Sequence, residues 1–155
     1  MNGLAFISPG LDPRLASPLA RALEGSHGLR DLSLFGKIEL RGSFLVDGPD
    51  VEVVRITPRR ALLLCEPERC AELLETLPGF AVDMTGALAG IELEGEALMR
   101  RLTDLDLSRL PASGKVAGVA ALVTGSGDER FRIFFAQEYG HSVVETVRDL
   151  QDGLA

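Results

Sequence analysis

Residues that could carry out nucleophilic or metal chemistry are few in this chain of 155 residues and stand far apart. His27 lies in a Gly-Ser-His-Gly loop and His141 near the start of the last expected helix, and neither adjoins a G-x-S-x-G motif that would supply a nucleophile. Cys65 and Cys70 are separated by four residues, and no Cys/His cluster of zinc spacing can be assembled around them. We interpret the histidines as surface residues and the cysteines as small buried side chains of a reducing compartment.

Carboxylates at short spacing are the next candidates. Asp104 and Asp106 could act as an acid–base pair or hold a cation, but their spacing is more typical of exposed or capping residues beside a helix end. Glu92 and Glu94 alternate outward along an expected strand and are predicted to face solvent or an interface. The Gly-Ser-Gly run that begins at Gly125 precedes a strand, whereas a phosphate loop precedes a helix, so we predict a hairpin turn there.

Two short patterns, Asp31-x-Ser33 and Asp83-x-Thr85, precede two similar strands. Side chains of these types accept hydrogen bonds from the backbone amides of tight turns, so we predict a capping role for them in preference to catalysis. The sequence therefore assigns no catalytic, cofactor-binding or metal-binding residue to this chain.

Composition excludes several classes of partner. The net charge is −7, whereas nucleic acids and anionic membranes are bound through Lys and Arg. No stretch approaches the roughly 20 apolar residues of a membrane-spanning helix, and residues 1–10 lack the pattern of a signal peptide. We predict a cytoplasmic protein without nucleic-acid or membrane partners. The acidic excess lies after residue 60 and indicates a solvated surface or one face of a subunit interface.

Hydrophobic periodicity and turn residues divide the chain into alternating helices and strands. The expected helices are 17–23, 66–77, 96–102 and 139–150, and the expected strands are 37–41, 51–56, 61–65, 91–93, 116–123 and 131–135. A turn over Asp47–Asp50 precedes the hairpin of strands 51–56 and 61–65. The first strand is expected to be half-buried, with Ile38 and Leu40 on its apolar face.

The order of elements repeats along the chain. Asp31–Gly42 is similar to Asp83–Gly95 with one inserted residue, and Arg60–Leu77 aligns with Arg130–Val147 without a gap. Chance similarity of amphipathic patterns is one explanation, and duplication is the one that we favour. It predicts an α+β fold of two related β/α halves, about 29–80 and 81–155, that share one core. Residues 1–28 would form an N-terminal arm ahead of this single domain of residues 29–155.

Several of these stretches carry a family resemblance. Ser17–Ala20, Leu29–Gly42 and Val82–Gly95 resemble the gamma subunit of heterotetrameric sarcosine oxidase, and Leu102–Leu107 is similar to the segment that follows them. The resemblance implies a fold like the folate-binding domain of aminomethyltransferases. It also implies alpha, beta and delta partner chains that carry FAD, FMN, NAD and tetrahydrofolate and oxidatively demethylate sarcosine to glycine. In isolation the chain could instead form a homo-oligomer.

The departures from the family are informative. Only Ser43–Asp50 separates the first two expected strands, so the insertion that supplies the folate-facing carboxylate of aminomethyltransferases is absent. Lys115 is followed by Val116, unlike the Lys-Gly-Cys-Tyr signature of the folate-dependent proteins of iron–sulfur assembly. The resemblance therefore implies a non-catalytic structural subunit of a bacterial oxidoreductase complex that binds no cofactor itself. A stand-alone tetrahydrofolate-binding or aminomethyltransferase-like protein of one-carbon metabolism is the alternative, so whether the chain is itself an enzyme stays open.

Overall fold

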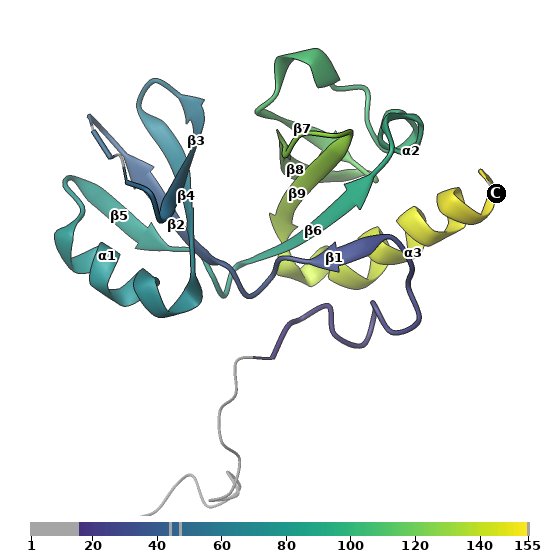
Figure 1. The fold of residues 1–155 in the computed structure, drawn as a ribbon, viewed down its shortest axis with the longest axis horizontal. Helices are drawn as coiled ribbons and strands as arrows, with labels where there is room; N and C mark the ends of the chain where they lie inside the picture. The colour runs from purple at the N-terminus through teal and green to yellow at the C-terminus, as the bar shows by residue number, and fades with distance from the viewer. Residues whose placement is uncertain (1–15, 44, 47, 155) are drawn as a thin grey trace, which may run out of the picture.

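Residues 16–43, 45–46 and 48–154 are described by the computed structural model of the chain. They form two antiparallel sheets and three α-helices (Figure 1), in agreement with the expected mixture of helices and strands. The five-stranded sheet has the strand order β1-β6-β9-β8-β7, and the four-stranded sheet has the order β3-β4-β2-β5.

The bounds of the elements are as follows. The five-stranded sheet consists of β1 (Leu29–Asp31), β6 (Leu88–Glu94), β7 (Ala112–Val116), β8 (Val119–Gly125) and β9 (Arg130–Ala136). The four-stranded sheet consists of β2 (Gly36–Arg41), β3 (Val51–Thr57), β4 (Arg60–Cys65) and β5 (Phe80–Asp83). The α-helices are α1 (Cys70–Thr76), α2 (Glu96–Leu102) and α3 (Gly140–Asp152), and short 3₁₀ turns are η1 (Pro67–Arg69), η2 (Leu107–Arg109) and η3 (Gln137–Tyr139).

The two sheets exchange a strand. β1 leads directly into β2 along the chain but pairs with β6 in the other sheet. β5 leads directly into β6 but pairs with β2. The chain therefore crosses between the sheets twice, at the turn after Asp31 and at the turn after Asp83. As a result, β1 belongs to the five-stranded sheet although β2 follows it, and β5 belongs to the four-stranded sheet although β6 follows it.

The apolar residues form three clusters that match a layered arrangement. α1 covers one face of the four-stranded sheet, and α2 and α3 cover one face of the five-stranded sheet (Figure 1). The other faces of the two sheets meet in a third cluster whose fully or nearly buried members are Leu32, Val54, Leu62, Leu64, Leu122 and Phe134. We call this contact the seam between the sheets. Among the described helices, none has the length and apolar character that crossing a membrane requires.

Several sequence predictions are confirmed. The hairpin of strands 51–56 and 61–65 corresponds to β3 and β4, and the helix expected over 96–102 is α2. The helices expected over 66–77 and 139–150 are also present, but each begins with a 3₁₀ turn, η1 or η3. The turn expected over Asp47–Asp50 lies partly outside the described residues, and its second half forms a turn at Pro49 and Asp50.

The helix expected over residues 17–23 is wrong. Those residues form consecutive turns, with only isolated backbone hydrogen bonds such as Leu23 N to Leu19 O at 2.8 Å. The segment packs on α3 through Leu19, which is fully buried beside Gly140. The residues that follow it are held there too, because Arg148 of α3 donates hydrogen bonds to Ser26 Oγ and the Glu24 carbonyl.

The strand expected over residues 116–123 is present as β8, but the prediction places its beginning three residues too early, because the run contains a hairpin turn. β7 ends at Val116 and β8 begins at Val119. Ala117 and Gly118 between them have φ of 50° and 81°, the backbone conformation that both central residues of a two-residue hairpin adopt. Because residues 116–123 form a nearly continuous apolar run, their sequence did not indicate this turn. Hydrophobic periodicity also did not indicate the short strands β1 and β5.

The prediction that the first strand is half-buried is also wrong, because β2 is buried on both faces. Ile38 and Leu40 lie on one apolar face as expected, and that face packs against α1, but Lys37 and Glu39 on the opposite face are buried as well. That face lies on the side of the four-stranded sheet that meets the seam. Its polar side chains are retained by hydrogen bonds within the protein, which is the condition for burying such groups.

Candidate functional site

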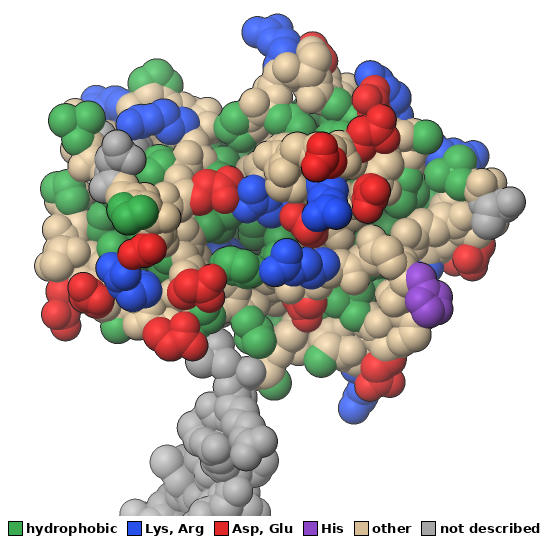
Figure 2. All heavy atoms as spheres, in the orientation of Figure 1, with side chains coloured by type: hydrophobic (Ala, Val, Ile, Leu, Met, Phe, Trp, Pro, Cys, Tyr) green, Lys and Arg blue, Asp and Glu red, His purple; other side chains and the backbone are tan. Residues whose placement is uncertain are grey.

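The seam between the sheets opens on one side into a groove. This inter-sheet groove has a volume of about 610 Å³, and its walls include Phe35, Val51, Glu52, Leu64, Arg69 and Arg132. Figure 2 shows acidic and basic side chains gathered between the two lobes of the molecule. Five of its ten lining residues are charged, namely Asp50, Glu52, Glu66, Arg69 and Arg132. Ligand sites are concave surfaces in which apolar and polar groups converge, so we take the groove as the candidate functional site.

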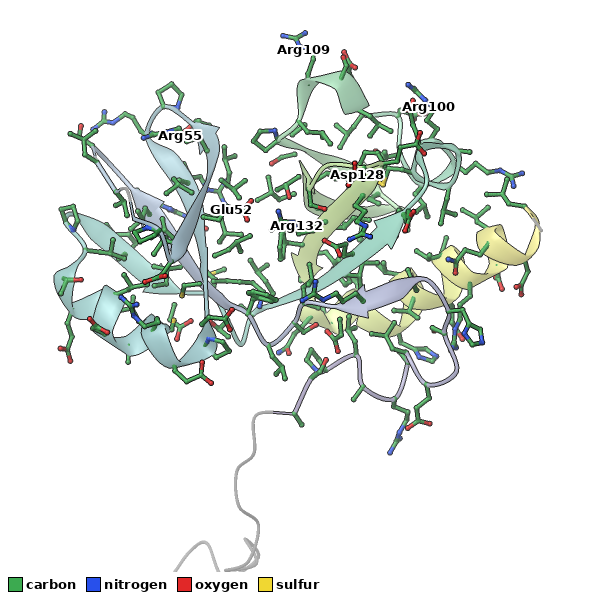
Figure 3. All side chains as sticks on the ribbon, in the orientation of Figure 1. Glu52, Arg55, Arg100, Arg109, Asp128 and Arg132 are labelled. Carbon is green, nitrogen blue, oxygen red and sulfur yellow. The ribbon has the colours of Figure 1, made fainter. Side chains whose placement is uncertain are left out.

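Arg132 on β9 and Glu52 on β3 join the two sheets across the groove. Arg132 Nη1 donates a hydrogen bond to Glu52 Oε2 at 2.7 Å, and Figure 3 shows the two side chains pointing toward one another. Glu92 Oε2 lies 3.9 Å from Arg132 Nε, and Glu92 Oε1 lies 3.8 Å from Arg30 Nη1. Ser126 also donates a hydrogen bond to Glu92, at 3.1 Å. Charges from both sheets thus form one connected row.

Some donors and acceptors of this region are buried without a hydrogen-bond partner among the described residues. They are Arg132 Nε, Arg69 Nε and Thr124 Oγ1. Thr124 pairs directly with Arg132 across β8 and β9. Arg69 Nη1 donates a hydrogen bond to Asp50 at 3.1 Å, and its Nε lies 3.2 Å from Glu72 without the alignment of a hydrogen bond. Unpaired buried polar atoms are rare in folded proteins, so their position beside the groove is significant.

A second carboxylate–arginine cluster lies along the seam. Glu39 accepts hydrogen bonds from Arg41 Nε at 2.6 Å and from Arg60 Nε at 3.1 Å. Burial alone would raise the pKa of Glu39, but the hydrogen bonds from Arg60 and Arg41 outweigh it and lower that pKa. Glu39 and Arg60 border a mostly apolar cavity of about 320 Å³ that also contacts both sheets.

Lys37 is fully buried where the chain crosses between the sheets. Its Nζ donates hydrogen bonds to the carbonyl oxygens of Ser33 at 2.7 Å and Phe35 at 2.8 Å. Burial lowers the pKa of Lys37 from 10.5 to about 8, and the charges of Asp31 and Asp83 offset part of that effect. This ammonium group therefore organises the backbone of the crossing and does not face the groove.

The capping roles predicted for the two Asp-x-Ser/Thr patterns are confirmed. Asp31 Oδ1 accepts a hydrogen bond from Ser33 N, and Asp83 Oδ1 accepts one from Thr85 N, both at 2.9 Å. Each hydroxyl then binds the strand of the opposite half: Ser33 Oγ accepts from Gly90 N at 3.2 Å, as does Thr85 Oγ1 from Lys37 N at 3.0 Å. The two patterns therefore fasten the two crossings.

The cysteines are buried and unbridged, as predicted. Burial raises the pKa of the Cys65 thiol to about 11, so it is protonated and weakly nucleophilic at neutral pH. Gly36 is required beside it, because a Cβ at that position would lie 2.6 Å from Cys65 Sγ.

The remaining candidate residues lie apart from the groove or at its edge. His27 and His141 are exposed, as predicted, and His141 lies 3.1 Å from Glu145 on α3. Asp106 caps Ser108 N at 3.0 Å. Asp104 and Glu94 are exposed. Gly125 is the last residue of β8, and Ser126 and Gly127 lie in the predicted β8–β9 turn. Glu92 joins the row of charges at the groove. Within the described part of the chain, no three His, Cys, Asp or Glu side chains are placed to hold a metal ion.

Arg132, Glu52 and Phe35 at the groove were not predicted from the sequence. One signal was available: Arg132 interrupts the apolar strand 131–135, and a charged residue on the second face of a strand that is buried on both faces needs a partner. The identity of that partner could not be found, because Glu52 is 80 residues away in the sequence.

Comparisons with known proteins find solved structures of similar fold. No family model matches the sequence, and no curated protein matches it. Among solved structures, a chain of heterotetrameric sarcosine oxidase from Corynebacterium sp. U-96 is similar over 89% of this chain and 95% of its own length, with a TM-score of 0.71 and 17% identity. The regulatory subunit of aspartate kinase from Thermus thermophilus is similar over 80% and 97%, with a TM-score of 0.52 and 14% identity. The expected likeness to a sarcosine oxidase subunit is therefore confirmed at the level of the fold.

Proposed function

We propose that this chain is a non-catalytic structural subunit of a sarcosine-oxidase-like flavoprotein complex, in the role of its gamma chain. The observation that carries the proposal is the end-to-end likeness of its fold to a chain of heterotetrameric sarcosine oxidase. Because the likeness covers nearly all of both chains, the matched chain has about the same length and is not one domain of a large subunit. The complex would oxidatively demethylate sarcosine to glycine, with FAD, FMN, NAD and tetrahydrofolate bound by alpha and beta chains and a delta chain also present.

The use of the most reactive side chains supports a structural role. Lys37 has both of its Nζ hydrogen bonds on backbone carbonyls of the crossing. Cys65 is held protonated by burial, and Asp31 and Asp83 cap turns. Lys37, Asp31 and Asp83 are thus engaged in the crossings between the two sheets, and Cys65 is unreactive in the core of the four-stranded sheet.

One surface is suited to contact a partner chain. β5 is an edge strand, and two of its side chains are exposed apolar groups, Phe80 (60% exposed) and Val82 (36%). The edge strand β3 carries charged residues and a bulge, and on β7 the Lys115 carbonyl is bonded by Thr103 Oγ1 at 2.6 Å. Such devices protect edges from pairing with other chains. β5 has fewer of them, so we place the docking surface there.

We also propose that the two halves, about 29–80 and 81–155, are a pseudo-duplication within one aminomethyltransferase-like domain that follows an arm of residues 1–28. The strand pairings support this. Ile38 pairs with Leu63 in one sheet as Ile91 pairs with Ile133 in the other. Those are the pairs that the two sequence alignments equate. The two hydroxyl-to-backbone bonds of the crossings are related in the same way.

Affinity purification of the tagged chain from its native cells at low salt tests the proposed function. We expect a cytoplasmic flavin-containing protein to be recovered with it in fixed proportion. Recovery of the chain alone, or as a homo-oligomer, would contradict the proposal.

A second candidate function is binding of a small ligand without a partner complex, including a stand-alone tetrahydrofolate-binding or aminomethyltransferase-like protein. The observation in its favour is the inter-sheet groove of about 610 Å³. Titration calorimetry with tetrahydrofolate distinguishes this candidate, because a saturable heat would support it and its absence would remove the folate version.

A further inference from the structure

The ion pair across the inter-sheet groove has one fixed and one exchangeable member. The Arg132 side chain is 19% exposed and lies on β9, whose neighbours β6 and β8 hold it on both sides. The Glu52 side chain is 45% exposed and lies on the edge strand β3. Glu52 can therefore turn toward water at little cost, whereas Arg132 keeps its place and would need another acceptor.

Arg132 has more donors than the protein satisfies. A guanidinium has five N–H donors, and of these Arg132 Nη1 binds Glu52 at 2.7 Å. Its Nε is buried without a hydrogen bond, and the Glu92 carboxylate is 3.9 Å away from it. Thr124 Oγ1, on the residue paired with Arg132, is also buried and without a partner. Arg132 thus keeps a buried N–H beside the groove that no described protein group accepts at hydrogen-bond distance.

Apolar surface adjoins the same guanidinium. Phe35 and Leu64 line the groove together with Arg132, and the same three residues line an adjoining cavity of about 230 Å³ that reaches Phe134. Among the other charges of the groove, Asp50 is bonded to Arg69 and Glu66 is exposed at the rim. Arg132, which pairs with Glu52 and has Glu92 3.9 Å from its Nε, is therefore the cation that adjoins this apolar surface.

We propose that the inter-sheet groove binds a small organic carboxylate with an apolar body. The ligand carboxylate takes the place of Glu52 on Arg132, and the apolar body lies against Phe35 and Leu64. Arginine is the residue best suited to this task because its planar fork matches a carboxylate. This inference does not depend on the proposed role in a flavoprotein complex, because the groove is formed by this chain alone.

Titration calorimetry of the full chain with benzoate tests the site, with benzamide and benzylamine as a neutral and a cationic probe built on the same ring. We expect benzoate to bind at least about tenfold more tightly than either, because a hydrogen bond to a charged group contributes about that factor. Arg132→Met should abolish the preference for benzoate. Arg130→Met, on the same strand and paired with Glu94 outside the groove, should leave it unchanged.

A second pair of variants decides the question even if Arg132→Met does not fold. Glu52→Gln keeps Arg132 and removes its competing carboxylate, so benzoate should bind several-fold more tightly than to the wild-type chain. Glu94→Gln removes the same charge outside the groove and should change the affinity little. Equal binding of the three probes, no benzoate binding, or the same effect from both glutamine variants would overturn the proposal.

Discussion

The Thr85 hydroxyl oxygen accepts a hydrogen bond from the backbone N–H of Lys37 at 3.0 Å, which joins the turn before β6 to strand β2 of the opposite sheet. Ser33 makes the corresponding bond to Gly90 N, and Leu32 N and Met84 N donate to the carbonyls of Gly90 and Lys37 at 2.8 and 2.7 Å. Each crossing is therefore fastened by a hydroxyl and a backbone amide. We infer that the two sheets form a single folding unit.

Ser33→Ala and Thr85→Val should each lower the free energy of unfolding by about 1–2 kcal/mol, because each leaves a backbone donor of a β-strand without its acceptor. The exposed Ser108→Ala is the control and should cost clearly less. Urea unfolding measures the three variants. A large loss for one crossing variant and none for the other would show that the crossings are not equivalent.

Lys37 should make stability rise with pH. Its pKa is about 8 in the folded chain and 10.5 ordinarily, so the unfolded chain holds more protons between these values. Loss of the proton therefore favours the folded state, and the free energy of unfolding should rise by up to about 1 kcal/mol from about pH 8 to about pH 9. Urea unfolding at the two pH values checks this.

Lys37→Met removes this titrating group. The increase in the free energy of unfolding between about pH 8 and about pH 9 should therefore be much smaller in the variant. Above about pH 9 the Cys65 thiol acts in the opposite direction, because its pKa is raised to about 11 from 9.0 and the unfolded chain loses that proton first. If the free energy of unfolding changes equally in the wild-type chain and in Lys37→Met between about pH 8 and 9, Lys37 is not the group responsible.

Residues 16–28 should be essential to the fold of the five-stranded sheet. Leu19 is fully buried against α3, where a side chain at Gly140 would collide with it. Leu19→Ala should cost about 3 kcal/mol, as for other buried leucines. Leu45→Ala, at a residue that is 93% exposed, should change stability by less than about 0.5 kcal/mol. Thermal unfolding compares them, and equal melting temperatures would refute the packing role of Leu19.

Local patterns were sufficient to predict much of this structure. The Asp-x-Ser/Thr caps were recognisable because donor and acceptor lie two residues apart. The helices over 66–77 and 139–150 followed from their apolar spacing, whereas the helix predicted over 17–23 is absent. The exchange of β1 and β5 was not predictable, because strand pairing is non-local and a three-residue strand carries little pattern.

The candidate site was less accessible to sequence reasoning than the fold. The face of β2 that meets the seam carries Lys37 and Glu39, so its sequence predicts an exposed face. These residues are buried because the five-stranded sheet packs against that side. Arg132 and Glu52 meet only because the two sheets pack against each other. A site built between sheets depends on tertiary contacts that periodicity does not encode.

Phe80→Asp should disrupt the proposed complex without unfolding the chain. Phe80 is 60% exposed on β5, so a charge there costs the isolated fold little but would be buried at the interface. Tyr139→Asp, at an aromatic residue that is 44% exposed beside α3, is the matched control. Co-purification should fall at least tenfold for the first variant only. Equal recovery of partner with both variants would remove β5 from the interface.

Native mass spectrometry of the assembly purified through this chain determines whether it is a structural subunit of a flavoprotein complex. We expect one assembly that contains this chain together with a flavin-bearing chain, with no flavin or folate bound to this chain after dissociation. Masses that correspond only to the free chain or to its homo-oligomers would contradict the claim that it is a structural subunit of a sarcosine-oxidase-like complex.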